Sequence, residues 1–200
     1  MKIEEKLIGL GLQVDTLEVH EIDMESVDFS HLLIGLSADP ADLLEPEIQD
    51  MRQIFKAVGT DPSRYRPSAE ALIRRLINGK SIPSINPVVD INNYISVKYR
   101  IPIGVYDLDE VHPPIEIRVG KEGERYQAIN NRIFNLNKKI AAFDRNGGFG
   151  SPISDSRRTM TTIRTRNVLV IFYAPRSADL TGAKREYLDL LKNIKGNGYV

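Results

Sequence analysis

Residues 65–109 constrain the fold more than any other part of the chain, because they hold two helix boundaries and a change of hydrophobic period. Pro67-Ser68 predicts the start of one helix and Gly79 its end. Asn86-Pro87 places an N-cap residue before a proline at the first helical position, which predicts a second helix. After it, the apolar residues of 103–106 predict a buried strand. The segment therefore predicts two helices followed by a sheet.

Outside this segment the same signals extend the pattern. Residues 3–22 are predicted to be strand, and one helix is expected from the Asp39-Pro40 cap to Gly59. Asp179 is expected to cap a C-terminal helix over 179–195 that ends at Gly196. Apolar runs between turn residues predict strands at 115–119, 126–129, 139–143, 159–164 and 168–173. This order predicts an α+β fold, a mixed or antiparallel sheet flanked by helices, as one domain over residues 1–200.

Composition excludes several classes of protein. With 200 residues and 42% hydrophobic content, the chain is suited to one globular core. No apolar run reaches the roughly 20 residues of a membrane helix, and residues 1–12 lack the apolar core of a signal peptide, so a cytoplasmic protein without membrane contact is expected. The chain has no cysteine, and its three histidines lack ligand spacing. We expect neither a metal nor another cofactor.

The net charge of zero conceals an asymmetry along the chain. Residues 1–50 carry two basic residues against thirteen acidic ones, and the remaining residues carry 25 basic against 14 acidic. An acidic N-terminal part beside a basic remainder indicates either a polyanionic partner for the basic part or internal neutralisation between the two parts. The sequence leaves these alternatives open.

Two motifs of the central segment resemble a known family. Residues 89–95 read V-D-I-N-N-Y-I and residues 101–107 read I-P-I-G-V-Y-D. They resemble V-D-V-T-N-Y-V and Q-P-x-H-A-F-D of the B3/B4 domain in the β subunit of bacterial phenylalanyl-tRNA synthetase, a module that hydrolyses mischarged tyrosyl-tRNA(Phe). Small free-standing proteins that consist of this domain alone are even more similar. The resemblance covers about residues 55–175 and implies a B3/B4-like fold that binds aminoacyl-tRNA.

The first motif identifies two candidate pocket residues. The Thr and Asn that line the editing pocket correspond to Asn92 and Asn93, on an otherwise apolar helix where Asn lowers helix propensity. For Asp90 of the same helix, a structural hydrogen bond to a neighbouring loop is the better interpretation.

Two departures from the family pattern leave the substrate open. Gly104 stands where the synthetases have the editing-site His, and a glycine there admits a larger substrate or close backbone approach. Ile171 falls where a Glu reads the tyrosine hydroxyl, so the amino acid recognised is not expected to be tyrosine. Tyr106 and Asp107 are interpreted as serving the strand end and its turn.

A third set of candidates follows the glycine-rich run 147–150, which is predicted to be a flexible loop at the pocket rim because it fits no phosphate-binding fingerprint. Gly148 is the candidate substrate-binding residue of this loop. The free-standing relatives tend to carry Asp-Ser-x-x-Thr at 155–159, which makes Asp155 and Thr159 candidate substrate-binding residues. The alternative for Asp155 is an exposed ion pair with the neighbouring arginines.

Four arginines are candidates for contact with tRNA. Phosphate contacts come mainly from Arg and Lys, and the candidates are Arg74, Arg75, Arg157 and Arg158. A solvated helix face explains Arg74 and Arg75 equally well.

Two functional hypotheses follow from the resemblance. The first is a trans-editing hydrolase that binds the acceptor end of a mischarged tRNA and cleaves the aminoacyl ester by positioning water. The second is a non-catalytic module that uses the same pocket to bind RNA or a small ligand, such as an amino acid or a nucleotide. Phenylalanine–tRNA ligase activity is not expected, because the chain lacks the ATP-site motifs. Association of copies through an apolar strand edge at 168–173 is a further hypothesis.

Overall fold

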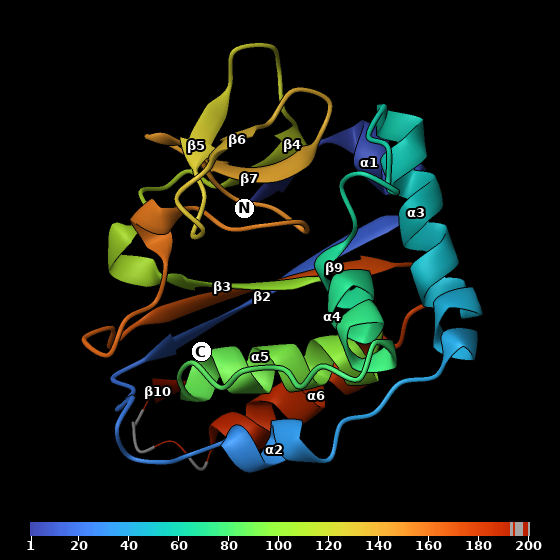
Figure 1. Ribbon diagram of the computed structural model, residues 1–200. Helices are drawn as coiled ribbons and strands as arrows, with labels where there is room; N and C mark the ends of the chain where they lie inside the picture. The colour runs from blue at the N-terminus through green and yellow to red at the C-terminus, as the bar shows by residue number, and fades with distance from the viewer. Residues whose placement is uncertain (193, 195–197, 200) are drawn as a thin grey trace.

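The computed structural model describes residues 1–192, 194 and 198–199, and these form two stacked sheets with helices on one outer side (Figure 1). The first sheet has the order β10-β2-β9-β3, and all its pairs are antiparallel. Its strands are β10 (Gly198–Tyr199), β2 (Leu12–His20), β9 (Val168–Pro175) and β3 (Ile103–Asp107).

The second sheet has the order β1-β4-β7-β8 and is mixed, because β1 runs parallel to β4 while the other pairs are antiparallel. Its strands are β1 (Lys2–Ile3), β4 (Glu116–Val119), β7 (Ile140–Asp144) and β8 (Gly147–Gly150). A separate hairpin joins β5 (Arg125–Gln127) to β6 (Ile133–Asn135). The predicted α+β class with mixed and antiparallel sheets is confirmed.

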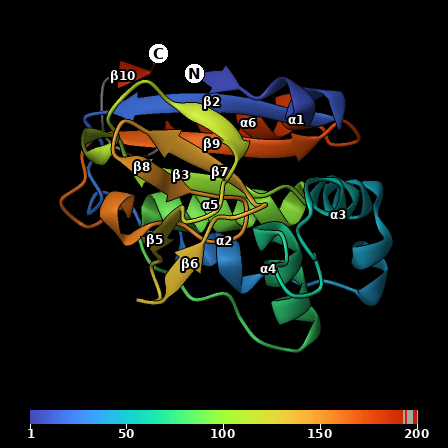
Figure 2. The same cartoon turned by 90° about the horizontal axis from the view of Figure 1, so that it is seen from above.

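The helices lie on one face of the first sheet and along its side (Figures 1 and 2). Helices α5 and α6 cover the face that points away from the second sheet, with α2 beyond them, while α3 and α4 stand beside the two sheets. The helices are α1 (Glu5–Gly9), α2 (Ser30–Ile34), α3 (Pro46–Val58), α4 (Ser68–Ile77), α5 (Pro87–Lys98) and α6 (Leu180–Leu191). Short 3₁₀ turns are η1 (Pro40–Leu44), η2 (Leu108–Glu110) and η3 (Arg157–Thr159).

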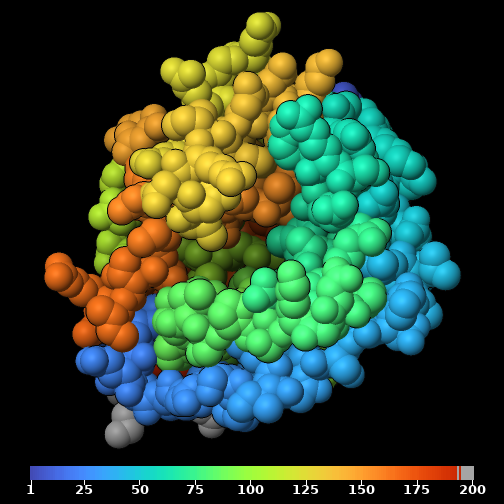
Figure 3. Space-filling view, in the orientation of Figure 1, coloured from blue at the N-terminus to red at the C-terminus, as the bar shows by residue number. Residues whose placement is uncertain are grey.

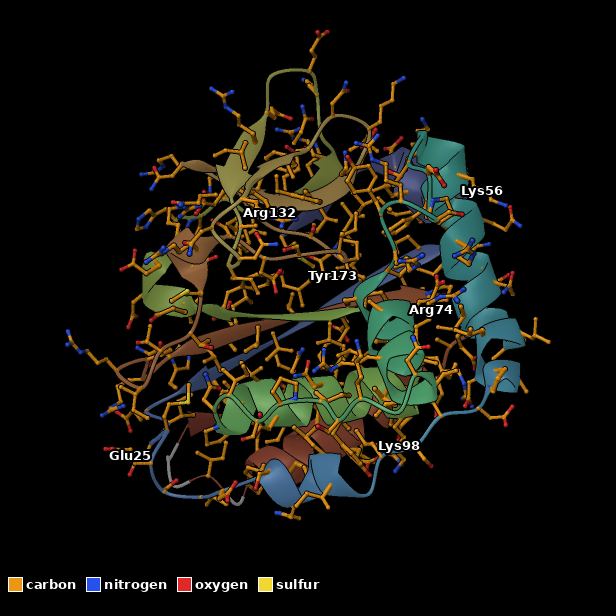
Figure 4. All side chains as sticks on the ribbon, in the orientation of Figure 1. Glu25, Lys56, Arg74, Lys98, Arg132 and Tyr173 are labelled. Carbon is orange, nitrogen blue, oxygen red and sulfur yellow. The ribbon has the colours of Figure 1, made fainter. Side chains whose placement is uncertain are left out.

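Strand β9 explains why the sheets stack as they do. All eight of its residues are buried, because alternate side chains enter two different cores. Val170 and Phe172 pack with the helices, whereas Ile171 and Tyr173 pack in the layer between the sheets. A strand covered on both faces is expected to be apolar throughout. Figure 4 shows Tyr173 in this layer.

The location of β9 within the first sheet shows that the prediction of an exposed strand edge at 168–173 is wrong. β9 lies between β2 and β3 and is hydrogen-bonded on both sides, so it cannot pair with another copy of the chain. The edge strand that matters for the site is β3, since its free side faces the groove described below.

Several predicted element boundaries are wrong. Residues 3–22 contain helix α1 between β1 and β2. Residues 159–164 are not a strand: Thr159 ends η3, Met160 forms an isolated bridge with Tyr106, and the rest is turn or irregular. The helix expected from Asp39 to Gly59 is divided into η1 and α3, because Pro46 starts a new helix and lacks the N–H group needed to continue the first. The run 147–150 is strand β8 and not a flexible rim loop.

The predicted helix caps are confirmed. The side chain of Asn86 accepts a hydrogen bond from Val89 N at 3.0 Å, and that of Asp179 accepts one from Gly182 N at 2.9 Å. Gly59 ends α3 in the left-handed conformation, with φ at 93°. The predicted end of the last helix at Gly196 lies outside the described residues. Within the described part of the chain, no helix is long and apolar enough to span a bilayer.

The acidic N-terminal part is built into this fold. Strand β2 pairs with β9 from Leu12 to Val19. Among the described residues, two ion pairs join the acidic part to the basic remainder, Asp42 with Arg100 at 2.7 Å and Asp15 with Lys184 at 2.8 Å. These contacts support internal neutralisation for at least part of the charge asymmetry.

Candidate functional site

A groove of about 820 Å³ opens at the free edge of β3. Its lower wall is α5, its side is α4 with the loop 82–85, and its upper wall is the segment 153–161 with residues 129–130. In the space-filling view it is the deep hollow between the green α5 region and the yellow and orange segments above (Figure 3). The walls are mainly aliphatic, and polar groups reach them at a few positions, the arrangement typical of a small-molecule site.

Asn92 is the buried polar group of the lower wall. Its residue is 7% exposed, and its Nδ2 donates to the Ile103 carbonyl of β3 at 3.1 Å. Tyr173 N donates to Pro102 O at 2.9 Å, so the carbonyl of Pro102 points toward β9. Because carbonyl directions alternate along a strand, the carbonyl of Ile103 points away from β9. Because the carbonyl can only accept, the amide oxygen must face away from it. That Oδ1 atom is buried and has no hydrogen-bond partner among the described residues.

Asn93 lies beside Asn92 on the groove wall, as the sequence predicted for both. Asp90 points instead to the loop and accepts hydrogen bonds from Ser84 Oγ at 2.5 Å and Ile85 N at 2.8 Å. Its predicted structural role is confirmed. Since residues 82, 83 and 85 line the groove, Asp90 fixes one of its walls.

Asp155 is the carboxylate of the upper wall. It accepts a hydrogen bond from Tyr106 Oη at 2.7 Å and a longer one from Ser151 N at 3.4 Å, and both end on Oδ1. Burial raises the pKa of Asp155 from 3.8 to about 7, while the hydrogen bonds from Tyr106 and Ser151 oppose this shift. Among the described residues no cation forms an ion pair with it, so the alternative of an ion pair with the neighbouring arginines is wrong.

Tyr106 crosses the layer between the two sheets to reach Asp155. Its ring packs edge-on against Phe149 of β8, with 5.0 Å between ring centroids. Its hydroxyl lies between two glycines: a Cβ atom would come within 2.0 Å of it at Gly104 and within 2.2 Å at Gly150. Burial raises the pKa of Tyr106 well above 10, so the hydroxyl stays protonated and donates. The interpretation of Tyr106 as a strand-end residue is wrong, whereas Asp107 does cap η2.

Gly104 therefore serves Tyr106 and not the groove directly. Its register partner on β9 is Ile171, so the two departures from the synthetase motifs lie opposite each other in the buried layer. Neither residue is among those that line the groove. A side chain at Gly104 would occupy the space that the Tyr106 hydroxyl fills.

Substitution of Gly104 tests this packing. We expect Gly104→Ala to lower the free energy of unfolding by about 1–3 kcal/mol, because the new methyl group overpacks against the tyrosine ring. Gly9→Ala is the matched control, since nothing lies within 4 Å of that position. Urea denaturation of both variants gives the comparison. Equal stability of Gly104→Ala and Gly9→Ala would mean that the ring is free to move aside.

The four candidate arginines divide into two pairs. Arg74 donates from Nε to Glu70 at 2.8 Å, and Arg158 pairs with Asp144 at 2.9 Å, so both are held by buried carboxylates. Arg75 is exposed, lines the groove and donates to Ser81 O at 2.7 Å. The exposed Arg157 bonds to Asn131.

The remaining candidates lie elsewhere. A second cavity of about 400 Å³ lies beside β5 and β8, where Gly148, Arg157 and Arg158 line it together with Arg125. Thr159 is fully buried and donates to Phe149 O at 3.0 Å. The structure thus brings Asn92, Asn93, Asp155 and Arg75 into one groove. It does not bring Gly104, Gly148, Thr159 or Ile171 to the surface of that groove.

Sequence reasoning missed Tyr106 as a site residue. The available signal was the spacing of Gly104 and Tyr106, which are two apart on one strand and therefore share a face. It also missed the apolar rim of the groove, where Ile85 is 65% and Ile129 54% exposed. These residues come from loops, whose approach to α5 has no periodic signal.

A family model and individual relatives both relate this chain to the same domain. The family model described as the B3/4 domain matches residues 50–188. The phenylalanine–tRNA ligase β subunit of Bartonella henselae is 33% identical over 100 residues, which are 49% of this chain and 12% of that subunit. Its counterpart from Bartonella quintana is 35% identical over 88 residues, or 43% of this chain and 11% of the subunit. The matched part thus spans about an eighth of the length of these relatives.

A solved structure agrees in fold. An N-terminal fragment of the phenylalanyl-tRNA synthetase β subunit from Pyrococcus horikoshii superposes with a TM-score of 0.51 at 15% identity. The superposition covers 96% of this chain and 48% of that one. At this identity the likeness concerns the arrangement of the elements.

Proposed function

Since the chain belongs to the B3/4 domain family, we propose that its groove binds the aminoacyl end of a charged tRNA and hydrolyses the ester. One observation carries the proposal: a groove of about 820 Å³ with aliphatic walls is lined by the carboxylate of Asp155 and by Asn92, whose buried Oδ1 has no hydrogen-bond partner among the described residues. An aminoacyl ester has an apolar side chain, an ammonium group and a carbonyl to be attacked. The groove offers a complementary group to each of them.

The ligand is oriented by these groups in the proposed complex. The amino-acid side chain enters the aliphatic part of the groove, and the α-ammonium donates to Asn92 Oδ1, a buried acceptor without a partner among the described residues that turns toward the groove to meet the ligand. Of the four candidate arginines, Arg75 and Arg157 are exposed and are assigned the contacts to phosphates of the acceptor strand. The aliphatic walls favour apolar amino acids as substrates, and the groove wall carries no acidic residue besides Asp155 to bind a hydroxylated side chain.

The test is hydrolysis of a panel of tRNAs, each charged with a different amino acid, by the purified protein. We expect release of free amino acid above the buffer rate for at least one apolar member. A panel with no turnover would overturn the hydrolase. If free amino acids then still raised the melting temperature, the groove would belong to a non-catalytic binding module.

Asn92→Ala tests the role of the amide. We expect kcat/KM for the best panel member to fall about tenfold to a hundredfold, because a hydrogen bond to a charged group contributes about 1.5–3 kcal/mol. Asn78→Ala is the control, since the exposed Asn78 bonds only to Arg74 O at the end of α4. Unchanged kcat/KM in Asn92→Ala, measured by initial rates, would remove the amide from the site.

A further inference from the structure

The carboxylate of Asp155 is placed for more than binding. It lines the groove, and both of its hydrogen bonds end on Oδ1, so Oδ2 is the oxygen that remains for a group in the groove. A buried carboxylate is normally paired with a cation, because burial disfavours an uncompensated charge. Asp155 has no such partner within the described residues, and its surroundings disfavour the charge.

We propose that Asp155 is the general base of the site, taking a proton from the water that attacks the ester carbonyl, and that Tyr106 positions its carboxylate. This inference rests on the proposed function and names the group that performs it. General bases work best when their pKa lies near the working pH, and the pKa of Asp155 is raised to about 7.

The reaction balances with these groups alone. Asp155 Oδ2 accepts a proton from water while the water oxygen bonds to the ester carbon. The bond between that carbon and the ribose oxygen then breaks, and the protonated carboxyl group returns its proton to the ribose oxygen. The products are the free amino acid and uncharged tRNA, and the carboxylate is regenerated.

The surroundings of Asp155 keep its titration simple. The titratable groups that face it are Tyr106 from β3, Tyr126 from β5 and Tyr173 from β9. Burial raises the pKa of all three tyrosines above 10, so they stay neutral where Asp155 titrates. Arg75 from α4 is the charged group on the facing wall of the groove. A single proton is therefore expected to control the rate near neutral pH.

Tyr106 acts through Asp155 and does not touch the substrate in this scheme. Its hydroxyl donates to Oδ1 at 2.7 Å, which holds the carboxylate in place and leaves Oδ2 for the attacking water. Its hydrogen bond also lowers the pKa of Asp155 relative to burial alone. Removing the hydroxyl should therefore move the titration of Asp155 upward without removing the base.

The experiment measures the pH dependence of hydrolysis for the best panel member with wild type, Asp155→Asn and Tyr106→Phe. We expect the wild-type rate to rise with a midpoint at about pH 7. Asp155→Asn should lower kcat about 10²–10³-fold with little change in KM and no midpoint. Tyr106→Phe should move the midpoint to higher pH and recover most of the rate there. Asp50→Asn, an exposed carboxylate on α3, is the matched control.

The possible failures are distinguishable. No turnover by the wild type would overturn the proposed function and this inference with it. Turnover with a flat pH profile, or with Asp155→Asn close to the wild-type rate, would overturn the base while leaving the hydrolase in place. An unchanged midpoint in Tyr106→Phe would overturn the positioning role alone. Melting temperatures at or above that of wild type show that each variant is folded.

Discussion

Glu70→Gln is expected to lower the free energy of unfolding by about 3–5 kcal/mol, because it leaves two arginines without their shared counter-charge. The Glu70 side chain is fully buried and accepts from Arg52 Nη1 at 2.8 and 2.9 Å and from Arg74 Nε at 2.8 Å. Arg52 comes from α3 and Glu70 from α4, so the pair fixes the two helices to each other. Figure 4 shows Arg74 on α4 beside α3.

This ion-pair cluster also matters for the site. Ser68, Ala71, Leu72 and Arg75 of α4 line the groove, so a loosened α4 should weaken ligand binding as well as folding. Urea denaturation measures the stability loss, and Glu122→Gln, an exposed loop residue, is the control. Replacing the pair together, as Glu70→Leu with Arg52→Met, should cost less than Glu70→Gln, because only Arg74, whose side chain is 42% exposed, then lacks its counter-charge. A loss below about 1 kcal/mol in Glu70→Gln would show that the cluster behaves as a surface pair.

Asp155→Asn is expected to stabilise the protein at neutral and alkaline pH. The folded-state pKa of Asp155 is about 7, against 3.8 for the ordinary group. Between these values the folded protein holds a proton that the unfolded chain has lost, so wild-type stability falls as pH rises through this window. The difference corresponds to about 4 kcal/mol, and solvent in the open groove should reduce it to about 2–4 kcal/mol. Asparagine keeps an acceptor for Tyr106 and carries no charge to bury.

The measurement is the unfolding free energy of wild type and Asp155→Asn at about pH 5 and about pH 8. The advantage of the variant should be larger at the higher pH, and the exposed Asp50→Asn is measured beside it as the control. An equal difference at both pH values would mean that Asp155 titrates normally. Together with the kinetic test, the expected outcome is a variant that is more stable and less active, which is typical of a site that holds an unfavourable charge for function.

The site was predictable where one element carries it. Asn92 and Asn93 stand out in the sequence because polar side chains are unusual on an apolar helix. In the structure both residues line the groove. Asp155 was a candidate because it lies in a short motif. The arginines next to it in the sequence suggested an ion pair, which it does not form among the described residues. Tyr106 was misread, since its role depends on Gly150 of the other sheet and not on its own strand.

Local signals determined much of the fold. Each of these signals involves residues that are close together in the sequence. They are the helix caps at Asn86 and Asp179, the helix end at Gly59 and the apolar run of β9. They suffice for the α+β class and for a run of helices that precedes the strands from residue 103 onward. They do not say which strand lies at an edge, because strand pairing joins residues far apart in sequence.

Tertiary structure alone decided what the site contains. It put β9 in the centre and β3 at the edge, so the groove opens beside Asn92 and not beside Ile171. It also brought Gly104 and Gly150 from two sheets around one hydroxyl, which then reaches Asp155. The physical reason is that burial and hydrogen bonding depend on all neighbours in space. Residues 65–109 supply the lower wall of the groove, and the segment 153–161 completes it only once the two sheets have stacked.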